Sequence, residues 1–262
     1  MTKPNVDNRV LAVDGDIIAY RTAAVCEDHF EGAADAIIAS TLTDIATATG
    51  CEKMRIYLSG TGNFRKGIAV TKPYKGNRAT MVRPKYLNHC KNYLINNYRA
   101  IQVHGFEADD GIASDMTQNN AIHCGIDKDI LQVPGDHYNY VKQEWQHVTD
   151  EEAEVILYRQ ILMGDTSDNI PGLPRVGAKT AEKIVEDHLT AHDDAIAYYK
   201  EICAEKMPDI DPIVYFNEQK ALIEMVHTVD LLNLFTVYVP QDSQGFVAQE
   251  VEENENKVEP KL

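Results

Sequence analysis

Acidic residues in four short groups are the first candidates for chemistry in this chain. The groups are Asp14, then Glu107 with Asp109 and Asp110, then Asp127 with Asp129, and finally Asp165 with Asp168. Carboxylates that lie close together repel one another unless cations neutralise them. Mg²⁺ and Mn²⁺ prefer oxygen ligands of this kind, whereas Zn²⁺ favours nitrogen and sulfur. If the groups converge, we expect a site for two divalent ions, which can activate water for attack on a phosphodiester.

Taken one at a time, the acidic groups also have ordinary structural explanations. Asp14 before a glycine suits a turn or a helix N-cap. The group from Glu107 to Asp110 suits the first turn of a helix, where the helix dipole favours negative charge. Asp127 and Asp129 are typical turn residues. All four acidic groups occur together in one chain and beside strand candidates, and this favours a metal site over these separate structural roles.

A basic segment accompanies the acidic groups, although the chain as a whole carries a formal net charge of -16. From residue 65 to residue 91 there is no Asp or Glu, and the basic residues are Arg65, Lys66, Lys72, Lys75, Arg78, Arg83, Lys85 and Lys91. Arginine offers a planar fork to phosphate oxygens and lysine a mobile point charge. We expect this segment to bind a DNA backbone, with Tyr74 stacking on a terminal base. The alternative is a solvated, flexible loop.

The most specific motif is Gly164-Asp-Thr-Ser-Asp-Asn-Ile-Pro-Gly-Leu-Pro-Arg-Val-Gly-Ala-Lys-Thr-Ala181. Its central part, from Gly172 to Gly177, is predicted to join two helices by a tight hairpin whose glycines let backbone N–H groups approach a phosphate. Such a hairpin grips duplex DNA without discriminating bases. We expect it to bind DNA through Gly172, Arg175, Gly177, Lys179 and Thr180. A simple helix cap and turn would need one glycine and would leave Lys179 and Thr180 unexplained.

The elements that must position these residues alternate between strands and helices. Strands are predicted at 9–13, 53–58, 100–104 and 120–126, helices at 33–49 and 107–119, and a turn at 14–16. This alternation predicts an α/β fold with a mainly parallel sheet flanked by helices. The carboxyl ends of parallel strands line one edge, where the acidic groups would meet. Further helices are predicted at 149–163, 178–188 and 194–226.

Three regions follow from this pattern. Residues 1–148 are expected to form the α/β core, including the basic segment at about 65–98. Residues 149–240 are expected to be helical, with the DNA-binding hairpin at about 150–190, and the acidic stretch 241–262 is expected to be disordered. We see no apolar run able to span a bilayer and no signal peptide, so we expect a soluble, cytoplasmic protein with no membrane partner. The five dispersed cysteines indicate neither a disulfide framework nor a zinc site.

In their order along the chain, these motifs resemble the 5′ nuclease family. The motifs are Val13-Asp-Gly15, Arg65-Lys66, Tyr74-Lys-Gly-Asn-Arg78, Glu107-Ala-Asp-Asp110, Asp127-Lys-Asp129 and the stretch 164–181. That family includes flap endonucleases, the 5′-exonuclease domain of bacterial DNA polymerase I and stand-alone bacteriophage 5′-to-3′ exonucleases. The resemblance covers roughly residues 9–190, and the chain looks like the free-standing phage type. It implies a PIN-like core, a helical arch over the site and a helix-three-turn-helix element that grips duplex DNA.

The resemblance also implies roles for individual residues. Asp14, Glu107, Asp109 and Asp110 would serve one metal ion, and Asp127, Asp129, Asp165 and Asp168 a second. Lys75 and Arg78 would act in catalysis by contacting the scissile or a neighbouring phosphate. Backbone groups from Gly172 to Gly177 would hold K⁺ against DNA.

One position departs from the family pattern. Relatives carry another Asp after the second strand, where this chain has Ser59 and Gly60. A hydroxyl is a poorer Mg²⁺ ligand than a carboxylate, so the first metal site should be weaker unless Asp16 compensates. This departure leaves open a structure-specific DNA-binding protein that has lost efficient catalysis. A second, separate alternative is a PIN-type ribonuclease that acts on RNA primers or RNA–DNA hybrids.

Overall fold

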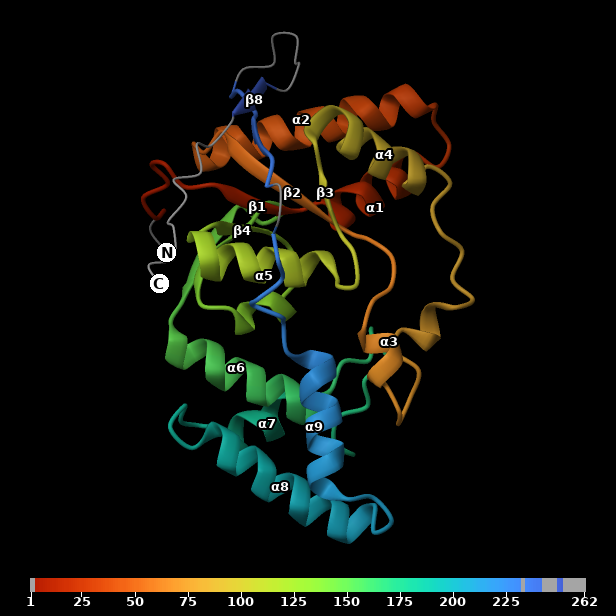
Figure 1. Ribbon diagram of the computed structural model, residues 1–262, viewed down its shortest axis with the longest axis vertical. Coiled ribbons are helices and arrows are strands. Elements are labelled where there is room, and N and C mark those ends of the chain that lie inside the picture. Colours follow the sequence, from red (N-terminus) through yellow and green to blue (C-terminus); the bar gives the residue numbers. More distant parts are fainter. Residues whose placement is uncertain (1–2, 232–233, 242–248, 252–262) are drawn as a thin grey trace, which may run out of the picture.

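An eight-stranded sheet forms one half of the molecule in the computed structural model, which describes residues 3–231, 234–241 and 249–251 (Figure 1). Along the sheet the strands are β6 (Glu144–Val148), β5 (Gly135–Asn139), β4 (Ile122–Gly125), β1 (Leu11–Asp14), β2 (Lys53–Ser59), β7 (Thr236–Tyr238) and β8 (Gln249–Val251), while β3 (Ile101–Val103) pairs with β2. The five strands β1 to β5 pair in parallel. The predicted mainly parallel sheet is therefore confirmed.

Antiparallel additions to this sheet were not predicted. The hairpin of β5 and β6 extends one side, and β7 pairs with β2 on the other. The expectation that the chain is helical as far as residue 240 is wrong for β7, because the chain returns to the sheet there.

The stretch 241–262, expected to be disordered, lies largely outside the described residues. Its residues 249–251 form β8, which pairs with β7, so these three residues differ from the expectation. Strand β6 escaped prediction because four of its five side chains are at least partly exposed and its sequence lacks an apolar period.

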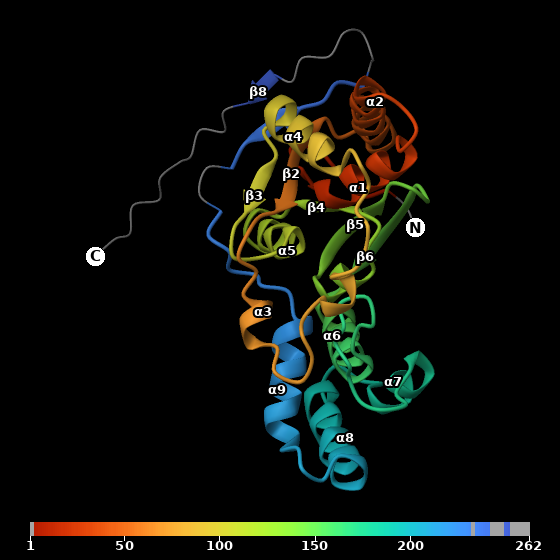
Figure 2. The same cartoon turned by 90° about the vertical axis from the view of Figure 1, so that its right-hand side faces the viewer.

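Helices cover both faces of the sheet. Helices α1 (Gly15–Val25), α2 (Glu31–Thr49) and α4 (Leu87–Tyr98) share one apolar core with β1 and β2, and α5 (Ala108–Asn119) packs on the opposite face (Figure 2). The predicted turn at 14–16 is wrong, since α1 begins directly at Gly15. The carboxylate of Asp14 caps that helix by accepting a hydrogen bond from the Ile17 N–H at 3.1 Å.

Four further helices form the other half of the molecule. They are α6 (Asp150–Met163), α7 (Ala178–Ile184), α8 (Ala191–Lys206) and α9 (Pro212–Ile223). Thr149 and Glu152 cap α6 reciprocally, at the start of the helix predicted at 149–163. Helix α7 ends four residues early, and the Arg159 guanidinium binds the carbonyl of Val185 just after it. The long helix expected at 194–226 is two helices, because Asp211 and Pro212 start a new one.

The basic segment connects the two halves along one side of the molecule (Figures 1 and 2). It contains α3 (Arg65–Ile68) and the single 3-10 turn η1 (Gly76–Arg78) before α4 begins. Between 79 and 86 the segment has no regular helix, so the arch implied by the resemblance is helical only at its two ends.

None of the helices that the structure describes combines the length and apolarity needed to cross a bilayer.

Candidate active site

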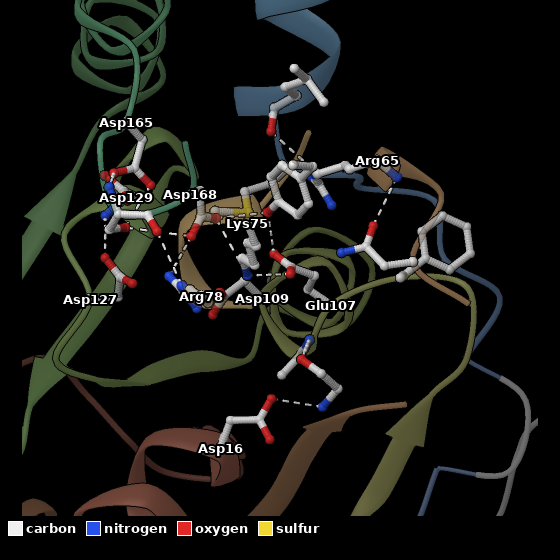
Figure 3. Close-up of a pocket in the computed structure, with 18 of the residues that line it drawn as sticks. Asp16, Arg65, Lys75, Arg78, Glu107, Asp109, Asp127, Asp129, Asp165 and Asp168 are labelled. Atoms are coloured by element: carbon white, nitrogen blue, oxygen red, sulfur yellow. Dashed lines mark hydrogen bonds and ion pairs between the residues drawn. The ribbon is translucent and has the colours of Figure 1, made fainter. Parts of the chain in front are cut away.

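A cleft of about 600 Å³ lies between the carboxyl edge of the sheet and the helical half. Seven of the eight carboxylates predicted to bind metal line it: Asp14, Glu107, Asp109, Asp127, Asp129, Asp165 and Asp168. They come from the end of β1, the start of α5, the loop after β4 and the loop after α6. Figure 3 shows Asp127, Asp129, Asp165 and Asp168 on one side and Glu107 with Asp109 facing them. Segments far apart in sequence thus meet at one place, which their local sequences alone do not require.

Burial and mutual repulsion raise the pKa values of two carboxyls in the cleft. Burial, followed by the charges of Asp14, Asp127 and Glu107, raises the pKa of Asp109 well above its ordinary value. Burial and the charges of Asp16 and Asp127 raise the pKa of Asp14 to about 7. Both carboxyls therefore hold their protons to higher pH than an isolated aspartate does, and a cation among them would favour the charged form.

Asp129 joins the third and fourth groups. Burial raises its pKa to about 7, and the charges of Asp127, Asp165 and Asp168 add to the effect. Its carboxylate accepts a hydrogen bond from the Gln160 amide at 3.2 Å, and Gln132 in turn donates to the Gln160 oxygen at 2.8 Å. These two glutamines were missed in the sequence, since a glutamine inside a helix or loop carries no signal of its own.

Basic side chains from the segment enter the same cleft. The Lys75 ammonium bonds Glu107 and lies 3.4 Å from Asp168, and the Arg78 guanidinium bonds Asp168 (Figure 3). Burial opposes the charge of Lys75, but Glu107 and Asp168 outweigh burial and raise its pKa. The segment is held there by backbone as well, because the Lys75 N–H donates to the Asp168 carbonyl at 2.8 Å.

The donor set suits hard divalent cations. It consists of carboxylate oxygens whose charges are compensated only in part, by Lys75 and Arg78. Within the described ranges, no three carboxylate, imidazole or thiolate side chains are already arranged to hold one ion. Two of the carboxylates, Glu107 and Asp168, are instead engaged by Lys75 and Arg78, so a bound cation would compete with these side chains for the same oxygens.

Metal affinity should consequently depend on pH. Asp14 and Asp129, with pKa values raised to about 7, are largely protonated at pH 6 and ionised at pH 8. Since ions bind the deprotonated form, we expect Mg²⁺ or Mn²⁺ affinity to fall about fivefold for each displaced proton between pH 7 and pH 6. The same raised pKa values make the metal-free fold lose stability as pH rises from about 4 to about 7. Calorimetric titration with Mn²⁺ in buffers of different ionisation enthalpy counts the protons released; equal affinity at pH 6 and pH 8 would contradict this assignment.

Two of the predicted site residues belong to the interior instead. Asp110 is fully buried, and its carboxylate forms two hydrogen bonds of 2.6 and 2.8 Å with the guanidinium of Arg65, which is 2% exposed. Arg65 also donates to the carbonyls of Leu222 and Glu224. Asp110 further accepts the N–H of Glu107. This bonding contradicts a metal-binding role for Asp110 and a DNA-binding role for Arg65, whereas the neighbouring Lys66 is exposed.

Tyr74 also differs from the expectation. Its side chain is 6% exposed, and its hydroxyl lies 2.8 Å from Glu107 and 2.7 Å from Asp168. Stacking on a terminal DNA base is therefore contradicted, because the ring is packed into the protein. The hydroxyl instead bridges carboxylates from the second and fourth acidic groups.

The hairpin after α6 divides into a buried and an exposed part. Gly172, with a φ of 57°, is buried so close to Gly164 that a Cβ atom would lie 2.3 Å from the Gly164 nitrogen. Its N–H donates to Gln219 and its carbonyl accepts from Tyr215, so the expected contact of Gly172 with phosphate is contradicted. The exposed part contains Arg175, Gly177 and Lys179, with Thr180 half-buried at the start of α7.

Ser59 stands at the end of β2, where relatives were expected to carry an acid. Its hydroxyl accepts the N–H of Ala108 at 3.0 Å, and its own N–H donates to Asp16 at 2.9 Å. The other Asp16 oxygen accepts from Lys91 at 2.6 Å. Asp16 thus brings a carboxylate to the end of β2 and lines the same cleft, but it stands apart from the main group (Figure 3).

The fold and this cleft define an α/β protein with a carboxylate-lined site at the carboxyl edge of its sheet. No protein-family model matches the chain. A 5′-3′ exonuclease of Buchnera aphidicola is 29% identical over 199 residues, which make up 66% of this chain and 68% of that protein. A 5′-3′ exonuclease of Bacillus subtilis is 31% identical over 103 residues, 33% of this chain and 35% of that protein.

Solved structures share the fold at lower identity. The bacteriophage T5 D15 protein co-crystallised with metal ions has a TM-score of 0.58 and 18% identity, covering 84% of this chain and 86% of that one. The catalytic core of Rad2 in complex with DNA substrate has a TM-score of 0.52 and 12% identity, covering 92% and 83%. The chain is thus similar in sequence to 5′-3′ exonucleases and shares its fold with these two solved structures.

Proposed function

We propose that this protein is a divalent-metal-dependent 5′ nuclease that hydrolyses DNA phosphodiesters near free 5′ ends or at branch points. The observation that carries the proposal is the convergence of Asp14, Asp109 and Asp129 from three separate segments on one cleft. Names of relatives support it: two are 5′-3′ exonucleases, and a T5 D15 flap endonuclease was crystallised with DNA and metal ions. The chain spans about two thirds of the first relative and about a third of the second.

The carboxylates would hold two ions, Mg²⁺ or Mn²⁺. Asp14, Glu107 and Asp109 would serve one, and Asp127, Asp129, Asp165 and Asp168 the other. When bound, such ions lower the pKa of a coordinated water and stabilise charge on phosphate oxygens. Gln160 and Gln132 orient the Asp129 carboxylate for this task.

Lys75 and Arg78 would contact the scissile or adjacent phosphate. Both now bond carboxylates in the cleft, so their charged groups already lie where a phosphate beside the ions would sit. The phosphate group can exchange for a carboxylate as their partner, because both present oxygens to the same donors.

A second surface would grip the duplex away from the cleft. Arg175, Gly177 and Lys179 are exposed around the start of α7, and nothing lies within 4 Å of a Cβ atom built on Gly177. A DNA backbone can therefore approach the main chain there, and K⁺ could bridge it to the hairpin carbonyls. Lys66, exposed on α3, would add a further phosphate contact.

A cleavage assay tests the proposal. The purified chain is incubated with a 5′-flap, a recessed 5′ end and a blunt duplex, each in Mg²⁺, Mn²⁺ or EDTA, with an RNA–DNA hybrid as a further arm. We expect metal-dependent cuts near the 5′ end or the junction. Tight DNA binding with no cleavage above the EDTA level would instead identify the DNA-binding alternative, which the replacement of an acid by Ser59 favours. Preferential cleavage of the hybrid would identify the ribonuclease.

A further inference from the structure

Hydrogen bonds attach the basic segment to the helical half on both sides of Lys75. After Pro73 it bonds the loop after α6, where the Asn77 amide donates to the Thr166 carbonyl at 2.9 Å and the Asn169 amide donates to the Pro73 carbonyl at 2.8 Å. Before Lys75, Arg65 bonds the carbonyls of Leu222 and Glu224, and a side chain of α9 holds the stretch in between. Glu218 accepts the N–H groups of Val70 and Thr71, each at 2.6 Å, and the hydroxyl of Thr71.

We propose that Glu218 is a positioning residue that presents Lys75 and Arg78 to the DNA backbone. This inference rests on the proposed function. Glu218 lies outside the cleft and touches none of its carboxylates, so it would act only through the segment. No motif in the sequence pointed to it, since it lies 148 residues from Val70 along the chain.

Helix α9 is suited to this role because the same helix also secures the DNA-gripping hairpin. Gln219, next to Glu218, accepts the N–H of Gly172 at 3.0 Å, and the Tyr215 hydroxyl donates to the Gly172 carbonyl at 2.6 Å. Helix α9 also packs against α3, α6 and α8. One rigid element therefore sets the spacing between the basic segment and the exposed hairpin, which are the two surfaces expected to contact one DNA molecule.

The chemistry at Glu218 explains why a carboxylate is needed. Two backbone N–H groups and one hydroxyl donate to it, and an ionised acceptor makes such bonds stronger than a neutral one does. Without it, the chain before Lys75 gains freedom that DNA binding must remove again. We expect Glu218→Ala to raise KM for DNA about tenfold, while kcat at saturating DNA changes little, because bound DNA itself then orders the segment.

The experiment compares Glu218→Ala, Glu218→Gln and the exposed neighbour Asn217→Ala. Hydrogen exchange of the DNA-free protein is followed for peptides covering 69–78, with peptides covering 170–176 as an internal reference. We expect faster exchange at 69–78 alone in Glu218→Ala, partial recovery in Glu218→Gln, which keeps one acceptor oxygen, and wild-type behaviour in Asn217→Ala. Steady-state KM and kcat are then measured for all three.

Three outcomes would overturn the proposal: unchanged exchange at 69–78, a KM within twofold of wild type, or faster exchange throughout the protein, which would indicate a general role in stability. A wild-type chain that neither binds nor cleaves DNA overturns the proposed function instead. The exchange measurement would in that case still decide whether Glu218 holds residues 70 and 71.

Discussion

Replacing Asp129 by alanine is expected to reduce DNA cleavage on the order of 10³-fold, because losing a ligand of a catalytic ion removes several kcal/mol of transition-state stabilisation. Asp129 is placed to have this effect: its carboxyl is partly buried, faces Asp127, Asp165 and Asp168, and is oriented by Gln160. Single-turnover cleavage of a 5′-flap substrate in saturating Mg²⁺ measures the loss. DNA affinity in Ca²⁺ or EDTA should change far less, since the basic segment and the hairpin remain.

Asp209→Ala provides the matched control, because Asp209 is an exposed aspartate in the loop between α8 and α9 and does not line the cleft. The thermal stability of both variants in EDTA shows whether they fold. In Asp129→Ala it should be unchanged or higher, since a carboxyl that is repelled by its neighbours has been removed. A folded Asp129→Ala protein that cuts within tenfold of the wild-type rate would remove Asp129 from the proposed site.

Replacing Arg65 by alanine should have the largest effect on stability. The substitution leaves the Asp110 carboxylate buried without its partner, a change that typically costs about 3–5 kcal/mol. For a chain of this size each kcal/mol lowers Tm by about 2–4 °C, so a fall on the order of 10 °C is expected. The loss also frees the carbonyls of Leu222 and Glu224, where α9 ends. Thermal unfolding followed by circular dichroism measures the change.

Lys66→Ala separates this effect from a simple loss of positive charge. Lys66 adjoins Arg65 on α3 but is exposed, so its removal should change stability by less than about 0.5 kcal/mol. If Lys66 contacts DNA as proposed, its removal should weaken DNA binding and reduce the salt dependence of that binding. Equal Tm values for Arg65→Ala and the wild type would mean that the Arg65–Asp110 pair does not stabilise the fold.

Much of the fold could be predicted because its signals are local. The strands predicted at 9–13, 53–58 and 120–126 correspond to the parallel strands β1, β2 and β4, and the Thr149–Glu152 capping box starts α6. Strands β6 and β7 could not be predicted in this way, since β6 is a largely exposed edge strand and β7 has only three residues. Strand β7 also pairs with β2, which lies far away along the chain, whereas β6 pairs with its neighbour β5 through a short hairpin.

The sequence by itself determined which chemical groups are available: acidic residues after strands, an acid-free basic segment and a glycine-containing hairpin. Only the tertiary structure decided how residues of the same type divide between site and interior. Asp109 faces the cleft while the adjacent Asp110 pairs with Arg65, 45 residues away, and Gly172 is buried while Gly177 is exposed. Burial and ion pairing depend on partners distant in sequence, and neighbouring positions on a helix or hairpin point in different directions. Residue type and spacing therefore predict a chemistry, but packing selects the side chains that can perform it.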